Sequence, residues 1–179
     1  MRKEKIWDPV VRVFHWALAA GILANGLFVD DESQLHITLG YGVVMLVLLR
    51  ILWGFTGSKH ARFSDFPPSI EQAMAQLSHM ATGRGRIYRG HTPLGALMMY
   101  NMLVTVLLIG ASGYMMTTAM FRSSGWVEEA HETFVIWMGF SILVHVGAAI
   151  LESRRSGVNL PLAMVTGTKT FPGHEVDKY

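Results

Sequence analysis

The chain is 179 residues long, a length typical of one domain, and it is 51% hydrophobic but only 16% charged. This composition, with a mean hydropathy of +0.33, excludes an ordinary soluble domain. The absence of cysteine excludes disulfides and metal sites built from thiolates. The net charge of +2 does not indicate nucleic acid binding, because the basic residues form no separate basic domain.

Four apolar stretches are each long enough to cross a hydrocarbon core, which takes about 20 helical residues. They cover residues 10–29, 36–55, 93–116 and 130–151. The first contains Arg12 and His15 and is followed by three more spans, so we expect a retained helix rather than a cleaved signal peptide. A backbone in lipid must satisfy its own hydrogen bonds, which leaves helices or a closed β-barrel. None of the four stretches alternates apolar with polar residues as a barrel strand does. The predicted fold is all-α, a four-helix transmembrane bundle forming one domain over 1–179.

The charged residues separate into two sides of the predicted bundle. Acidic residues mark the connections between the first two and the last two spans, at 30–32 and 128–129. Every Lys and Arg except Arg122 falls on the opposite side, together with both termini. The positive-inside rule makes that side cytoplasmic, so we expect both termini in the cytoplasm and the acidic connections outside.

The connection over 57–90 is too long to be a plain loop. Ser69-x-x-Gln72 follows two prolines and predicts the start of a helix, which apolar residues at helical spacing then continue. The sequence predicts a short cytoplasmic interfacial helix that lies on the membrane surface. A helix that caps the bundle is an equally good interpretation.

Histidines on three spans pair by depth. His131 and His145 lie 14 residues apart on the last span, so both point in nearly the same direction and are separated by about 21 Å. His15 begins the first span on the cytoplasmic side, and His36 begins the second on the outer side. His15 therefore shares a depth with His145, and His36 shares a depth with His131.

Two imidazoles that face each other inside a bundle can ligate a haem from both sides, which favours electron transfer over oxygen binding. Without cysteine, any such haem is b-type and held non-covalently. Zinc requires four ligands, and neither level offers a tetrahedral set, since Glu132 points about 100° away from its neighbour His131. Two arginines are candidate partners for the propionates of the inner haem: Arg12, one turn from His15, and Arg50, on the His36 stripe but at the cytoplasmic level. Snorkelling to the interface is the alternative for both.

Small residues accompany the predicted ligands. Glycine lets a flat macrocycle approach a helix backbone, although close packing between helices explains each glycine equally well. The glycines concerned are Gly40, Gly42, Gly139 and Gly147.

The sequence resembles bacterial cytochrome b561 proteins and the related b-type cytochrome subunits of nickel–iron hydrogenases. The matching motifs are WDPVVRVFHW at 7–16, HxxxGY at 36–41, RILWGFTGS at 50–58, ARFSDF at 61–66, GHTPLGA at 90–96, and EAHE at 129–132 with His145. The resemblance covers nearly the whole chain and implies that His15, His36, His131 and His145 hold two haems b. Thr92 stands where the family usually has Asn, which affects no proposed ligand.

Other histidines and polar residues lie outside the four predicted ligands. His91 begins the third span on the cytoplasmic side, where it contacts propionates of the inner haem or replaces His15 as a ligand. We expect Tyr100 and Asn101, deep in the third span, to pack or to make a hydrogen bond between helices rather than to contact quinone. His60, His79 and His174 are expected in solvent.

The resemblance implies a dihaem cytochrome of the bacterial inner membrane that carries electrons between the quinone pool and a redox protein, either a c-type cytochrome or a dehydrogenase or hydrogenase subunit. Two explanations of the acidic outer loops are left open. The loops dock a basic partner protein, or their charge reflects only the usual bias that keeps basic residues on the cytoplasmic side. Haem-free alternatives are a histidine-containing transporter and a membrane anchor subunit. A catalysed quinone-linked reaction, the direction of electron flow and a homodimer are left open.

Overall fold

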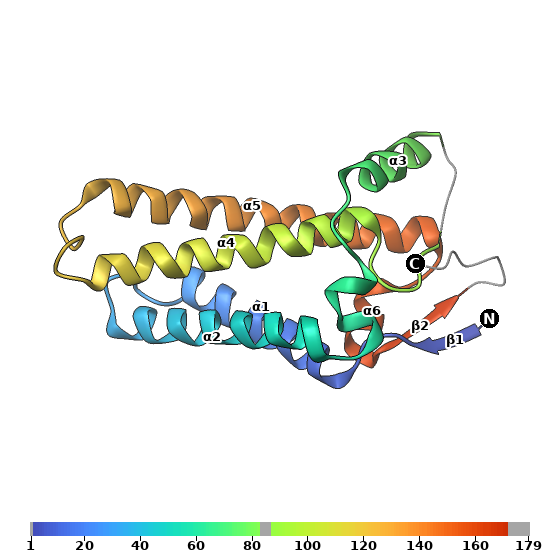
Figure 1. Cartoon of the computed structure of the whole chain (residues 1–179), viewed down its shortest axis with the longest axis horizontal. Coiled ribbons are helices and arrows are strands. Elements are labelled where there is room, and N and C mark those ends of the chain that lie inside the picture. The colour runs from blue at the N-terminus through green and yellow to red at the C-terminus, as the bar shows by residue number, and fades with distance from the viewer. Residues whose placement is uncertain (1, 83–86, 172–179) are drawn as a thin grey trace. The chain divides into compact units, whose positions relative to one another are not determined.

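A computed structural model describes residues 2–82 and 87–171. Four of its helices are long and apolar enough to cross a membrane: α1 (Pro9–Leu27), α2 (Gln34–Thr56), α4 (Pro93–Thr117) and α5 (Gly125–Ser156). The predicted all-α transmembrane bundle is confirmed (Figure 1).

Helix α5 is longer than the predicted span of 130–151, because charged residues extend the helix beyond the apolar run at both ends. Glu128 lies in its first turn, and Arg154 and Arg155 lie in its last turn. Each charge opposes the partial charge of the helix terminus that it adjoins, so these polar turns remain helical.

The chain divides into two compact units. Unit 1 contains Met1–Arg12, Leu52–Tyr100 and Leu143–Tyr179, and unit 2 contains Val13–Ile51 and Asn101–Ile142.

Unit 2 consists of segments of all four long helices around a small apolar core. Val43 and Val47 of α2, Val106 of α4 and Met138 of α5 are buried there, and Leu18 of α1 packs against them. Glycine permits one close approach, since a Cβ at Gly110 of α4 would lie 2.3 Å from Val44 Cγ2 of α2.

Several large apolar side chains of unit 2 are exposed on its surface. Leu27, Phe28 and Ile136 are 70%, 84% and 73% exposed. In a chain with four membrane-length helices, such side chains contact lipid rather than water.

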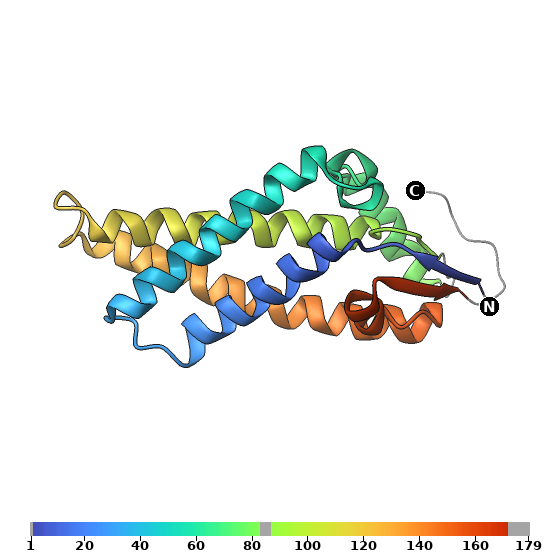
Figure 2. The same ribbon diagram turned by 90° about the horizontal axis from the view of Figure 1, so that it is seen from below.

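Unit 1 contains two short strands that the sequence did not predict. Strand β1 (Arg2–Lys5) pairs antiparallel with β2 (Thr168–Phe171), with Arg2 opposite Phe171, and both views show the strands side by side (Figures 1 and 2). The charged segment Arg-Lys-Glu-Lys has no alternation of apolar and polar residues, so its pairing is determined by tertiary contacts rather than by its own pattern.

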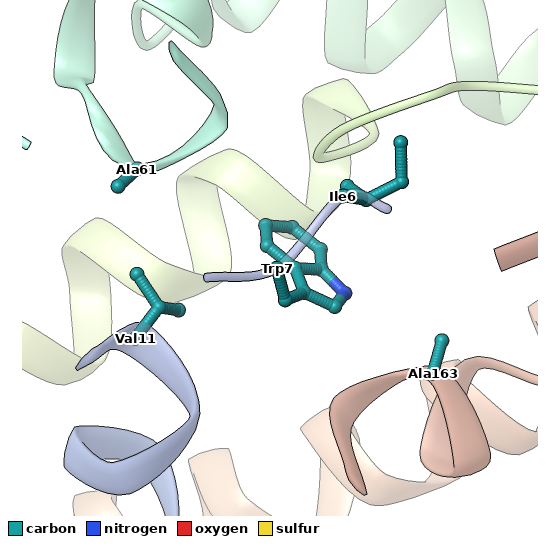
Figure 3. Packing of buried hydrophobic residues seen from close by; sticks show 5 residues of the cluster. All are labelled: Ile6, Trp7, Val11, Ala61 and Ala163. Carbon is teal, nitrogen blue, oxygen red and sulfur yellow. The ribbon is translucent and has the colours of Figure 1, made fainter. Parts of the chain in front are cut away.

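The core of unit 1 forms around Trp7. Ile6, Trp7 and Val11 are buried with Ala61 and with Ala163 of α6 (Leu160–Thr166), and the Trp7 ring lies in the middle of this group (Figure 3). Gly167 ends α6 in the left-handed conformation, at φ 82°, and its carbonyl accepts hydrogen bonds from the Ile6 and Trp7 amides. A Cβ at this glycine would lie 2.7 Å from Trp7 O, so both the turn and the close approach require glycine here.

The predicted cytoplasmic helix is present as α3 (Ile70–Ala81), after the 3₁₀ turns η1 (Lys59–Ala61) and η2 (Phe63–Asp65). The Ser69 side chain accepts from the Gln72 amide at 3.2 Å, as its capping motif predicts. Gln76 Oε1 accepts from the Leu94 amide in the first turn of α4. Arg155 donates to the Met80 carbonyl, so α3 is tied to both neighbouring helices of unit 1.

Candidate functional site

His36 and His131 lie close together in unit 2. The turn before α2 holds His36, because its amide donates to Ser33 Oγ at 3.1 Å and Ser33 Oγ donates to the Asp30 carbonyl. His131 follows in the second turn of α5. Their ring centroids are 6.4 Å apart and the rings are inclined by 67°.

The surroundings of the two imidazoles differ. His131 Nδ1 lies 3.0 Å from Ser112 Oγ of α4, whereas the buried His36 Nδ1 has no hydrogen-bond partner among the described residues. Gly113, next to Ser112, leaves room for the His131 ring, since a Cβ there would lie 3.2 Å from His131 Cε1. Ser112 carries no signal in the sequence, because its contact with His131 depends on how α4 and α5 are rotated against each other.

The pair fits a group that takes one imidazole on each face. The 6.4 Å between centroids is close to the roughly 6 Å that separates two imidazoles bonded to one metal ion at about 2 Å each. Among residues 2–82 and 87–171, no three His, Cys, Asp or Glu side chains gather into a metal cluster. The donor set of two imidazoles and no thiolate is the one that b-type haem uses for electron transfer.

Two further predicted residues belong to unit 2. His15 is half-buried on α1, and its ring meets the Trp16 ring edge-on at 5.1 Å. Arg50 of α2 is only 6% exposed. A guanidinium buried among apolar helices is costly unless polar or anionic groups face it, so its burial fits the predicted role toward a propionate.

Three predicted residues belong to unit 1. Arg12 donates from Nη2 to the Val165 carbonyl near the end of α6, a structural contact that the sequence analysis had not anticipated. The ring of His91 lies 4.8 Å from the Trp7 ring and 4.1 Å from the Phe66 ring. His145 is half-buried on α5. The predicted pairing of His145 with His15 stays a prediction.

Asp8 of the WDP motif makes hydrogen bonds within unit 1 to the start of α1 and to the end of α2. Asp8 caps α1 by accepting from the Val11 amide at 2.8 Å, and its other oxygen accepts from Ser58 Oγ and Trp53 Nε1. Burial raises the pKa of Asp8, but these hydrogen bonds outweigh it and hold the pKa below its usual value. Asp8 therefore joins the first motif to the motif at 50–58, where Trp53 and Ser58 lie.

Lys169 of β2 is a buried cation that the sequence analysis had placed simply on the cytoplasmic side. It is 3% exposed, donates to the Gly90 and Tyr88 carbonyls at 2.8 and 3.4 Å, and lies 5.4 Å from the Trp7 ring centroid. Burial lowers its pKa to about 8, against the opposing charge of Glu152.

One expectation about the other histidines is wrong. His60 is not solvated, because η1 and η2 fold the chain so that its Nδ1 lies 2.8 Å from Asp65 Oδ2, with side chains only 17% and 13% exposed. His79 is half-buried on α3 rather than fully exposed, and His174 lies outside the described residues.

The expectation for Asn101 is confirmed. Its Nδ2 donates to Ser141 Oγ of α5 at 2.9 Å, and its Oδ1 accepts from Trp137 Nε1 at 3.0 Å. Thr92 accepts from the Gly95 amide at 3.0 Å and so caps α4. Asparagine is an equally good cap, which explains why the departure from the family pattern is harmless.

The prokaryotic cytochrome b561 family model matches residues 6–167. Among curated proteins, a probable Ni/Fe-hydrogenase B-type cytochrome subunit of Cupriavidus necator is 25% identical, over 93% of this chain and 86% of the relative. Proteins of the same name from Bradyrhizobium diazoefficiens and Azotobacter vinelandii are 23% and 25% identical, over 93% and 96% of this chain and 85% and 90% of the relatives. No solved structure matches the chain.

The family match identifies haem b as the cofactor, and the His36–His131 pair fits such a group. Haem b is the cofactor of a b-type cytochrome, and four membrane-length helices make this one a multi-pass membrane protein. Because the family model matches residues 6–167, the chain belongs to the prokaryotic cytochrome b561 family and is a b-type cytochrome that transfers electrons.

Proposed function

We propose that this cytochrome binds two haems b and carries electrons across the bacterial inner membrane between the quinone pool and a redox protein partner. The observation that supports the proposal most directly is the His36–His131 pair, whose ring centroids are 6.4 Å apart. The second supporting observation is that α5 carries His145 as well as His131, with a further histidine, His15, on α1.

Each residue of the proposed sites has a separate role. His36 and His131 hold the outer haem, and His15 and His145 hold the inner one. Arg50 and Arg12 face propionates, and His91 contacts the inner propionates. When bound, haem supplies a one-electron couple at its iron. His36 with His131, and His15 with His145, would each supply two imidazoles to a haem, a donor set that favours electron transfer over oxygen binding.

The partner that we propose is a hydrogenase subunit. Five relatives carry the name Ni/Fe-hydrogenase B-type cytochrome subunit, and each alignment covers at least 85% of the relative. The separation of acidic from basic connections supports an orientation with both termini in the cytoplasm.

Haem stoichiometry tests the ligand assignment. The purified wild type should contain two haems b per chain by pyridine haemochrome assay, and His131→Ala and His145→Ala should each contain one. His79→Ala, a histidine of α3 outside both proposed pairs, should retain two. Two haems in either ligand variant would reject the pairing.

A second substitution separates His15 from His91. If His15 is the inner ligand, His15→Ala loses the inner haem, and His91→Ala keeps two haems with a shifted inner spectrum. Loss of a haem in His91→Ala together with two haems in His15→Ala would assign the ligand to His91 instead.

Electron transport is tested in proteoliposomes that contain a quinol and an impermeant oxidant on one side of the membrane. The wild type should reduce the oxidant, and both His131→Ala and His145→Ala should abolish the reaction. Equal rates in all three proteins would contradict transfer through two haems.

A further inference from the structure

The hydrogen bond between Ser112 and His131 has a direction that the surrounding atoms determine. Ser112 is 6% exposed on α4, and its Oγ lies 2.8 Å from the Leu108 carbonyl and 3.1 Å from the Ile109 carbonyl. A serine hydroxyl has one hydrogen, and both carbonyls can only accept. The hydroxyl therefore donates to its own helix, in the usual manner of a serine within a helix.

The Leu108 carbonyl is the nearest of the three groups around the hydroxyl, at 2.8 Å, so we assign the serine hydrogen to it and the donor role to His131, which also bonds to the Ile109 backbone. The Oγ lone pairs remain available, and His131 Nδ1 lies 3.0 Å away, so this nitrogen carries the hydrogen. In a neutral imidazole with hydrogen on Nδ1, the Nε2 lone pair is free to bind a metal ion.

The neighbouring glycine fixes the position of the same ring. A Cβ at Gly113 would lie 3.2 Å from His131 Cε1 and 3.6 Å from its Nδ1, so the imidazole lies directly against the α4 backbone. His36 differs, because its buried Nδ1 has no hydrogen-bond partner among the described residues. One imidazole of the pair thus has a hydrogen bond at Nδ1, and the other has none among the described residues.

We propose that Ser112 is a positioning residue that fixes the tautomer and orientation of His131 for ligation of the outer haem. This inference rests on the proposed function, in which His131 is an axial ligand. A hydrogen bond accepted from Nδ1–H makes the imidazole a stronger donor to iron and favours the oxidised state. Ser112 therefore raises the affinity of the outer site and lowers its midpoint potential.

The test compares three variants of the full-length cytochrome. Ser112→Ala removes the hydroxyl and leaves the Ile109 backbone, Ser112→Thr keeps the hydroxyl, and Thr105→Val is the matched control. Thr105 is also buried on α4, at 3% exposure, and donates to the Asn101 carbonyl one turn earlier, at 2.8 Å.

The readouts are haem affinity by titration of the haem-free protein, the midpoint potential of the outer haem, and its low-spin electron paramagnetic resonance signal. Loss of a hydrogen-bond partner of a ligating histidine typically costs about 10–100-fold in metal affinity, so Ser112→Ala should weaken outer haem binding about tenfold or more. It should also raise the midpoint potential and shift the resonance signal. Ser112→Thr should restore all three values, and Thr105→Val should leave them unchanged.

Two results would overturn the inference in different ways. If Ser112→Ala behaves like Thr105→Val while His131→Ala loses the outer haem, Ser112 has no positioning role and the proposed function stands. If His131→Ala keeps both haems, His131 is not a ligand, and the inference fails together with the ligand assignment.

Discussion

Units 1 and 2 use their buried polar side chains in different ways. In unit 2, the buried hydroxyls of Thr105 and Ser112 donate to carbonyls of their own helix, and Asn101 bonds across to α5. In unit 1, Lys169 and Asp8 bond to groups from distant parts of the chain. The polar side chains of unit 2 thus add hydrogen bonds to helices that form without them. The polar side chains of unit 1 instead connect short elements that are far apart in the chain.

The difference explains where substitutions should matter most. Helices in lipid satisfy their own backbone, so a lost side-chain hydrogen bond in unit 2 leaves few groups unsatisfied. The loops of unit 1 depend on side chains such as Lys169 for their carbonyl partners. We therefore expect larger effects on stability from the polar groups of unit 1 than from those of unit 2.

The largest expected effect is the pH dependence that Lys169 produces. Its amine holds a proton up to about pH 8 in the folded chain, against its ordinary 10.5 in the unfolded chain. Unfolding therefore takes up a proton between these values, and stability rises with pH across this window, by about 3 kcal/mol in all. The measurement is the free energy of unfolding in detergent between pH 7.5 and 10.5.

Two variants check that this slope comes from Lys169. In Lys169→Met, which keeps an unbranched apolar stem beside Trp7, the rise should disappear. In Lys3→Ala, a substitution at an exposed lysine on the partner strand, the rise should persist. A slope that is unchanged in Lys169→Met would assign it to other groups.

The next largest effect should come from Gly54 of α2. A Cβ there would lie 2.3 Å from Phe63, whose ring also meets the rings of Phe55, Phe66 and Tyr100. Gly54→Ala should cost about 2 kcal/mol, because an aromatic ring held on several sides cannot yield without disturbing its neighbours. Thermal unfolding in detergent measures the loss.

Two other glycines calibrate that loss. Gly110→Ala in unit 2 creates an equally short contact, but with the single side chain of Val44, so about 1 kcal/mol is expected. Gly26→Ala meets nothing within 4 Å and should not destabilise the protein. Equal losses at Gly54 and Gly110 would show that the aromatic group of unit 1 is no stiffer than the valine of unit 2.

Unit 2 was largely predictable from the sequence, and unit 1 was not. Continuous apolar runs determine the four long helices, and depth along those runs sufficed to select His36 and His131 as neighbours. Ser112 was not predictable, because helix rotation brings it to His131 from a different span. In unit 1, the capping motif at Ser69 and the apolar residues at helical spacing after it predicted α3.

The rest of unit 1 depends on contacts between residues far apart in the chain. Strand β1 pairs with β2 across more than 160 residues, and Asp8 bonds to Ser58 across 50. Lys169 is the one charged residue in the sequence 157–171 that follows α5, and nothing in that pattern indicated that it would be buried. Local periodicity carries no information about such pairings.

A smaller effect is expected from Asn101 in unit 2. Asn101→Leu removes the acceptor of Trp137 Nε1 and the donor to Ser141 Oγ. Hydrogen bonds between membrane helices contribute about 0.6 kcal/mol on average, so the loss should be about 1 kcal/mol for the two together. Unfolding in detergent measures it, and Trp137 fluorescence should shift as its indole loses this partner.

The free energy lost in Asn101→Leu tests whether polar groups in unit 2 contribute less to stability than those in unit 1. A loss above about 3 kcal/mol, as for a buried charge left without its partner, would contradict the view that polar groups only supplement the helices of unit 2. Trp137→Phe is the matched control, because it removes one of the two hydrogen bonds and should cost about half as much.

The smallest effect concerns where α3 lies and involves no loss of stability. Ile70, Met74 and Leu77 form an apolar stripe that is 75%, 59% and 45% exposed, while Ala73 and Gln76 are buried against unit 1. Glu71, Gln72, Ala75 and Ser78 occupy the remaining exposed sector. A helix attached along one edge, with separate apolar and polar sectors, is suited to the membrane surface.

Spin labels can distinguish this position from a helix that caps the bundle in water. The chain has no cysteine, so Met74→Cys and Ala75→Cys each give a single labelling site. These neighbouring positions point about 100° apart on the helix. At position 74 the label should collide more often with oxygen, which concentrates in lipid, and at position 75 with a water-soluble nickel complex. If both labels prefer the nickel complex, α3 caps the bundle in water, and unit 1 meets the membrane only through its long helices.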